Sequence, residues 1–222
     1  MCVRFLVPGF EFGGRAGEAL SALKAGGEPV PPTLEIFPHK PAPVVFVDSG
    51  AFTAQYMLFG YSAQFAGKAK PTWLPNARSE TAFTLPTWRD SLAQRRCLVP
   101  AVGFYERSRQ KTERLFAAKN EVVFFLAAVY KDFPSLAAKP GGAKFPKMTL
   151  FDSPANRSAD RLAAQNQRRF AILTKSADEV VGQVHDRMPV VISENSLDDW
   201  FFGDFEGCFH RSNVELVSKV ET

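Results

Sequence analysis

The stretch RRCLVPAVGFYE at residues 95–106 decides the fold, because it joins an apolar strand to a carboxylate. Small, β-branched and aromatic residues at 97–105 predict one buried strand. Glu106 follows directly. A carboxylate at the edge of a buried strand is costly to desolvate, which raises its pKa toward the range useful for acid–base chemistry. The alternative is a Glu106 that reaches solvent or pairs with an arginine.

Other apolar segments resemble this strand, and helical patterns are fewer. Strands with separate short helices, and no βαβ alternation, predict an α+β fold. We expect one domain over residues 1–222, with a β-rich, barrel-like antiparallel core and a few short peripheral helices. The further predicted strands are residues 43–48, 122–130, 170–174 and 190–192, and the predicted helices are residues 18–25, 158–169, 176–184 with Ser176 as N-cap, and 196–202.

Composition excludes several classes of protein. The 222 residues carry a net charge of +4, which permits a polyanionic partner without requiring one. No apolar run approaches the roughly 18 residues of a membrane span, and the first residues do not resemble a secretory signal. The three scattered cysteines indicate neither a disulfide framework nor a zinc site. We therefore expect a cytoplasmic protein without a metal.

Two segments read as loops, at residues 66–75 and 138–156. The second is rich in lysine and proline and continues into several arginines. Residues 138–169 are thus predicted to be a basic surface insertion, and the alternative is a flap that faces nucleic acid. The 21 phenylalanines mostly predict core, although exposed aromatic rings also serve as stacking surfaces for unpaired bases.

Cys2 follows the initiator methionine, and it is small enough for Met1 to be removed. The chain would then begin with an amine and a thiol on adjacent carbons. The amine condenses with an aldehyde and the thiol closes on the imine, which gives a five-membered ring. Both groups are partly available as nucleophiles near neutral pH. The plain alternative is that Cys2 has no special role.

Two polar strings add candidate residues. In NARSET (residues 76–81), Asn76 could hold a reacting group and Arg78 could fork onto a phosphate, whereas the alternative is a surface turn with a local Arg78–Glu80 pair. In VHDRMPV (residues 184–190), His185 lies beside an acid and a base and titrates in the useful range. The chain's other histidines, His39 and His210, lack such neighbours, and we interpret them as incidental.

In order, MCVRF, NARSET, RRCLVPAVGFYE and HDRMPV resemble the SRAP family, the SOS-response-associated peptidase-like or abasic-site processing proteins. The resemblance spans nearly the whole chain. It implies that Cys2 captures the aldehyde of an abasic site in single-stranded DNA as a thiazolidine. By motif it further implies that Asn76 positions the amine, Glu106 assists ring opening and proton transfer, and His185 shuttles protons. Arg4 and Arg78 are implied as phosphate contacts.

The resemblance implies no cofactor, a monomer and a nucleoid-associated location. The chain departs from the family pattern at Val3 and Arg107, and at FGYSA (residues 59–63) in place of Trp-Gly-Leu-Ile-Pro; these changes concern the DNA-stacking surface. Strand-cleaving lyase activity is a short chemical step from the imine. Two alternatives stay open: a peptidase with an N-terminal cysteine, and a binding module that grips nucleic acid without chemistry.

Overall fold

The computed structural model describes residues 2–9, 13–24, 33–67, 69, 71–120, 123–133, 168–211 and 214–219. Most of the predicted basic insertion, and residues 158–167 of a predicted helix, lie outside these residues. Arg168 and Arg169, which that prediction made helical, instead begin strand β12. This part of the prediction is wrong because strand pairing on both sides of β12 overrides a helical pattern in the sequence.

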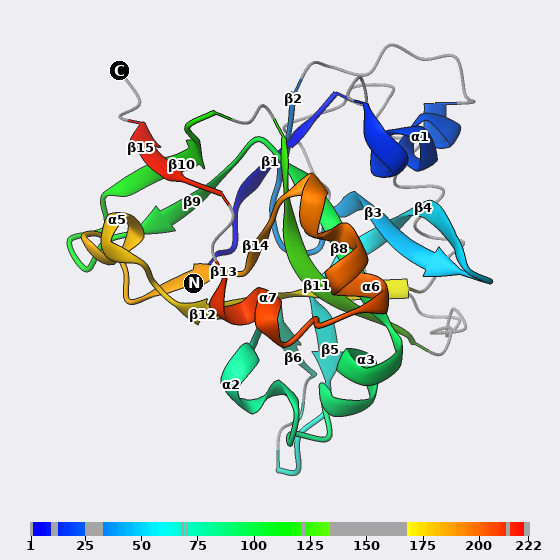
Figure 1. Cartoon of the computed structure of the whole chain (residues 1–222). Helices are drawn as coiled ribbons and strands as arrows, with labels where there is room; N and C mark the ends of the chain where they lie inside the picture. Colours follow the sequence, from blue (N-terminus) through cyan, green and yellow to red (C-terminus); the bar gives the residue numbers. More distant parts are fainter. Residues whose placement is uncertain are drawn as a thin grey trace.

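Five strands close into a barrel, which confirms the predicted barrel-like α+β core (Figure 1). The pairing runs β4–β3–β8–β11–β12 and returns to β4. All of these pairs are antiparallel except β12 with β4, which is parallel. Closure leaves no free edge between these strands. The barrel strands are β3 (Pro41–Asp48), β4 (Ala51–Phe59), β8 (Arg96–Ala101), β11 (Phe124–Asp132) and β12 (Arg168–Ser176).

A second, five-stranded sheet packs beside the barrel and carries the N-terminal strand. Its order is β15–β10–β9–β1–β2, and all of its pairs are antiparallel. The strand β1 therefore lies between β9 and β2. The strands are β1 (Phe5–Pro8), β2 (Thr33–Ile36), β9 (Gly103–Arg107), β10 (Glu113–Ala118) and β15 (Leu216–Lys219).

The strand predicted over residues 97–105 is in fact two strands, one in each sheet. β8 ends at Ala101 and β9 begins at Gly103. Between them, the backbone N–H of Val102 donates to the carbonyl of Leu6 at 2.9 Å. A Cβ on Gly103 would lie 2.8 Å from the side chain of Leu115 and 3.0 Å from the carbonyl of Phe116, so the crossing needs glycine. The break was invisible in the sequence because both strands are buried and apolar.

Four of the five barrel strands, β3, β8, β11 and β12, are buried on both faces over most of their length, which explains their nearly continuous apolar sequences; β4 is mostly half-buried. Along β3, Val44 and Phe46 pack into one core with the five-stranded sheet and α5, whereas Val45 packs into a second core beneath α1, α3, α6 and α7. The helices are α1 (Gly14–Ser21), α2 (Ser79–Ala82), α3 (Arg89–Gln94), α5 (Glu179–Gly182), α6 (Leu197–Phe202) and α7 (Gly207–His210), with 3-10 turns at Ala22–Lys24 and Glu194–Ser196.

Several predicted boundaries need correction. The predicted helix at 18–25 begins earlier, as α1 and its 3-10 extension. The predicted helix at 176–184 shrinks to α5, and its N-cap is Asp178, whose carboxylate accepts from two backbone N–H groups, because Ser176 still belongs to β12. The prediction at 196–202 is confirmed by α6. None of the helices in the described ranges is long and apolar enough to cross a membrane.

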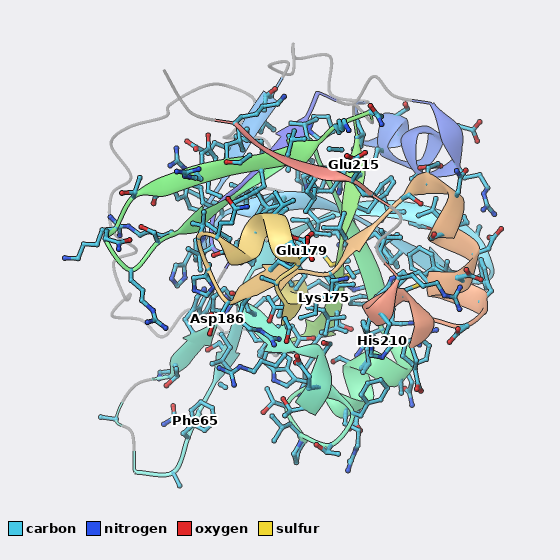
Figure 2. All side chains as sticks on the ribbon, turned by 60° about the vertical axis from the view of Figure 1, so that its left-hand side comes forward. Phe65, Lys175, Glu179, Asp186, His210 and Glu215 are labelled. Carbon is cyan, nitrogen blue, oxygen red and sulfur yellow. The ribbon has the colours of Figure 1, made fainter. Side chains whose placement is uncertain are left out.

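Short strands complete the structure around the barrel. The predicted loop at 66–75 contains a strand, β6, that pairs with β5 in a hairpin. Figure 2 shows Phe65 on this hairpin, which projects away from the body of the molecule. Directly after the hairpin, β7 joins β12 in parallel. These strands are β5 (Tyr61–Ala63), β6 (Thr72–Leu74), β7 (Asn76–Arg78), β13 (Arg187–Pro189) and β14 (Val191–Ile192).

Candidate active site

Cys2 lies at the start of the strand that enters the five-stranded sheet. Phe5 of β1 pairs with Phe104 of β9, and the N–H of Tyr105 donates to the carbonyl of Arg4 at 2.9 Å. Because the two strands are antiparallel, the residues that precede β1 run toward the end of β9, where Glu106 lies. The side chain of Cys2 is fully buried.

Burial sets the protonation of both Cys2 and Glu106. Desolvation raises the pKa of the Cys2 thiol well above its ordinary value, and the nearby carboxylate of Glu106 raises it further. Glu106 is only 1% exposed, and burial raises its pKa as well, whereas a protonated His185 would lower it. The sequence-based expectation of a desolvated carboxylate at this strand end therefore agrees with the geometry. The thiol is therefore protonated at neutral pH, and the pKa of the Glu106 carboxyl is higher than that of an exposed glutamate.

Asn76 contacts the backbone of the candidate nucleophile directly. Its side-chain Nδ2 donates to the carbonyl oxygen of Cys2 at 2.9 Å, across 74 positions in the sequence. Among the described residues, its Oδ1 is buried and has no hydrogen-bond partner. β7 holds Asn76 opposite Ile172 of β12, so the barrel wall fixes its position. Beside Cys2, the Nδ2 of Asn76 is thus hydrogen-bonded, and its Oδ1 is available as an acceptor.

His185 lies on the connection between α5 and β13. The backbone N–H of Arg187 donates to its Nδ1 at 2.9 Å, which places the proton of the neutral ring on Nε2. Asp186 also lies 3.1 Å from Nδ1, but as an ion pair this contact would require the opposite protonation, and the Asp186 side chain is 83% exposed. The backbone bond therefore decides the tautomer.

An ion pair between the motifs at residues 76–81 and 184–190 was not predicted from the sequence. Glu80 does not pair with Arg78; its carboxylate receives both terminal nitrogens of Arg187, at 2.5 and 2.9 Å. Arg187 also donates to the carbonyl of Thr174 at 2.6 Å. This bond network joins α2, β12 and β13, and it lowers the pKa of Glu80. Both partners lie inside motifs that were already noted, but their pairing spans 107 positions and no local pattern reveals it.

The two arginines predicted to contact phosphate differ in environment. Arg78 is exposed. Arg4 lies over the ring of Tyr105, with 3.9 Å from its guanidinium carbon to the ring centroid, and donates to Glu35 at 2.5 Å and to Glu113 at 2.6 Å. A phosphate at Arg4 would have to compete with two carboxylates, whereas Arg78 is open to solvent. In the described part of the chain, no group of three or more histidine, cysteine, aspartate or glutamate side chains could hold a metal ion.

The structure therefore brings together Cys2, Asn76, Glu106 and His185, which we call the Cys2 cluster. A family model described as SOS response associated peptidase (SRAP) matches residues 1–211. The chain belongs to the SRAP family. All four motifs that surround the Cys2 cluster fall inside the matched residues. Two departures of this SRAP chain from the family pattern, Val3 and Arg107, are both exposed, so neither disturbs the core.

Curated relatives of this SRAP chain include the abasic site processing proteins YoqW and YobE of Bacillus subtilis (strain 168). Each is 26% identical over 129 residues, which cover 56% of this chain and 46% and 47% of the respective relatives. The match thus spans about half the length of the curated relatives.

Two crystal structures from Bordetella bronchiseptica share the fold of this SRAP chain. One protein has a TM-score of 0.60 at 17% identity, covering 99% of this chain and all of its own. The other, described as a phage-related protein, has a TM-score of 0.59 at 18% identity, covering 99% of this chain and 95% of its own. At this identity the likeness concerns the fold alone.

Proposed function

We propose that this chain, once Met1 is removed, captures abasic sites in single-stranded DNA covalently through Cys2, as a thiazolidine that shields the lesion. Membership of the SRAP family and the names of its curated relatives support the substrate. One observation carries the chemistry: the amide of Asn76 holds the carbonyl of Cys2 while the buried Glu106 acts on the same residue's thiol.

The reaction balances without a cofactor. The α-amine of Cys2 adds to the sugar aldehyde and loses water to give an imine, and the thiol then adds to the imine carbon as its proton passes to the nitrogen. The open Oδ1 of Asn76 is suited to accept from the freed amine. Glu106, with its raised pKa, would donate a proton to open the closed sugar and accept one from the thiol. His185 would relay protons between this carboxyl and solvent.

The DNA strand would reach the Cys2 cluster along exposed basic residues. Arg78 follows Asn76 in β7 and is open to a phosphate. Arg4 would serve the same purpose once a phosphate displaces Glu35 and Glu113. We propose a monomer that acts on DNA at the nucleoid.

The deciding experiment mixes Met1-free protein with single-stranded DNA that contains one abasic site, followed by a denaturing gel. The wild type is expected to give a shifted band, and Cys2→Ala none. Cys208→Ala is the matched control, because it removes another buried thiol, and it should crosslink like the wild type. A band from Cys2→Ala, or none from the wild type, would overturn the proposal. Glu106→Gln and His185→Ala should slow the band's appearance.

The same experiment separates the alternatives. A lyase would cleave the DNA strand at the abasic site, with or without a lasting adduct. A peptidase would cleave a peptide in the absence of DNA, and its activity would also depend on Cys2. A module that only binds would give complexes that salt and denaturant dissolve.

A further inference from the structure

A stacked group of side chains lies outside the Cys2 cluster, where the β5–β6 hairpin meets the barrel. The imidazole of His39 stacks on the indole of Trp73, with 4.1 Å between ring centroids and 20° between planes. The guanidinium carbon of Arg169 lies 4.5 Å from the centroid of Trp73. We call these three residues the Trp73 platform. Nothing in the sequence singles out His39, and the structure places it in this stack.

The backbone holds the Trp73 platform in place. A Cβ on Gly60, whose φ is +102°, would lie 2.4 Å from Nε1 of Trp73, so only glycine lets the indole pack there. His39 itself has a φ of 71°, and its N–H donates to the carbonyl of Phe59 at 2.9 Å. The ring of His39 is exposed on a residue whose backbone is unusual for a side chain. Such a conformation indicates that the position of this ring is closely determined.

The guanidinium of Arg169 has no ion-pair partner among the described residues, and its Nε is buried without a hydrogen-bond partner. Its neighbour Arg168, by contrast, donates to Asp132 at 2.9 Å. Burial lowers the pKa of Arg169, and the charge of Arg169 helps burial to lower the pKa of His39. At neutral pH the Trp73 platform thus offers a neutral exposed ring next to an unpaired guanidinium.

The Trp73 platform lies in line with the Cys2 cluster. Asn76 pairs with Ile172 in parallel strands, and Trp73 and Arg169 each lie three residues before this pair. Three residues of extended strand span about 10 Å. The segment that follows β2 also connects the two regions, because the guanidinium of Arg4 lies 5.6 Å from the ring of Phe37 and His39 follows two residues later. Phe37 and His39, which are exposed, therefore lie between Arg4 near the N-terminus and the rest of the Trp73 platform.

We propose that the Trp73 platform binds undamaged nucleotides of a DNA single strand next to the abasic site, with a base on the ring of His39 and a phosphate on Arg169. This proposal rests on the proposed function and names the residues that hold the flanking strand. A flat exposed ring suits any base, and an unpaired guanidinium matches a phosphate. A folded acidic protein would use the charge but not the stacked ring, so the observations favour the single strand.

The test measures the affinity of the Met1-free chain for an undamaged oligothymidine, by fluorescence anisotropy at several salt concentrations. His39→Gly removes the ring and relieves the positive φ, and it should weaken binding at least about fivefold, since stacking on one base contributes about 1–3 kcal/mol. His210→Ala, which removes another exposed histidine, should have no effect. Arg169→Gln should lower the slope of log affinity against log salt by about 0.7, the value for one phosphate of a single strand.

Arg89→Gln is the control for Arg169→Gln, because Arg89 pairs with its neighbour Asp90 on α3. The proposal is overturned if His39→Gly and Arg169→Gln bind within twofold of the wild type, if the chain does not bind the oligothymidine, or if it prefers duplex of equal length. Crosslinking to abasic DNA, measured on the same proteins, separates the two proposals. If the wild type forms no crosslink but its affinity for the oligothymidine still depends on His39, only the proposed function is contradicted. If the wild type forms the crosslink but its affinity does not depend on His39, only the proposal for the platform is contradicted.

Discussion

The Cys2 cluster and the Trp73 platform both adjoin strand β12, through the pairing of Asn76 with Ile172 and through Arg169, yet their charged groups have different surroundings. Within the cluster Glu106 is buried, and next to the cluster Arg187 donates to Glu80 and to the carbonyl of Thr174. At the platform, Arg169 touches aromatic rings and no described carboxylate. An arginine held by a carboxylate and a carbonyl keeps the local geometry in place, whereas an arginine on a flat ring with no described carboxylate partner is available to a ligand. The bonds around the Cys2 cluster hold side chains in position, whereas the Trp73 platform leaves a cation available for binding.

Removing the bonds of Arg187 to Glu80 and Thr174, next to the Cys2 cluster, should give the largest effect on stability. Arg187→Ala removes a side chain that is only 13% exposed, and it leaves Glu80 and the carbonyl of Thr174 without this partner. We expect the free energy of unfolding to fall by about 2–3 kcal/mol, measured by urea denaturation. Arg89→Ala breaks an exposed pair and should cost less than about 1 kcal/mol. Equal losses for the two variants would contradict a special role for Arg187.

Breaking the packing of the Trp73 platform should cost less. Gly60→Ala places a methyl group 2.4 Å from Nε1 of Trp73 and strains a φ of +102°. We expect a loss of about 1–2 kcal/mol in unfolding free energy and weaker binding of single-stranded DNA, because the indole must move. Gly50→Ala carries similar strain, at a φ of +81°, but meets no atom within 4 Å, so it should leave DNA binding unchanged. The prediction fails if the two variants bind DNA equally well.

Glu106→Gln should have the smallest effect on stability, and this effect should depend on pH. Burial raises the pKa of Glu106 in the folded chain, so its ionisation is harder there than in the unfolded chain. The resulting cost to stability is absent below the unfolded pKa, grows as pH rises, and is complete above the folded pKa. Glu106→Gln should therefore gain stability relative to the wild type as pH rises above the ordinary glutamate pKa of about 4.3 and then through the raised pKa of the folded chain. A difference that is constant or shrinks across this range, in thermal unfolding, would contradict a buried and costly carboxyl.

Much of the Cys2 cluster could be predicted from local sequence because each member belongs to a short, distinctive string. Cys2, Asn76, Glu106 and His185 were all named as candidates before any contact was known, and the structure places them together. The predictions that were wrong involve competition between local and distant interactions. Ser176 has a helix-capping sequence but pairs with Arg187 in a sheet, and the apolar run at 97–105 divides between two sheets because burial hides the break.

The Trp73 platform could not be predicted, because its residues come from three separate segments and share no motif. His39, Trp73 and Arg169 acquire a common role only when β12 pairs with β4 and β7 and brings Arg169 beside the β5–β6 hairpin. Periodicity and composition report how each segment is buried, and they carry no information about which distant segment lies alongside.

The sequence by itself determined the α+β class, the barrel-like core and the residues of the Cys2 cluster, since burial patterns and short motifs are local properties. Only the tertiary structure decided that Glu80 pairs with Arg187, that Arg4 pairs with Glu35 and Glu113, and that Arg169 lies on Trp73 without an ion-pair partner among the described residues. The physical reason is that charge pairing and ring stacking act over a few ångströms in space. Strand pairing in the barrel and in the five-stranded sheet brings positions that are far apart in the chain within that distance.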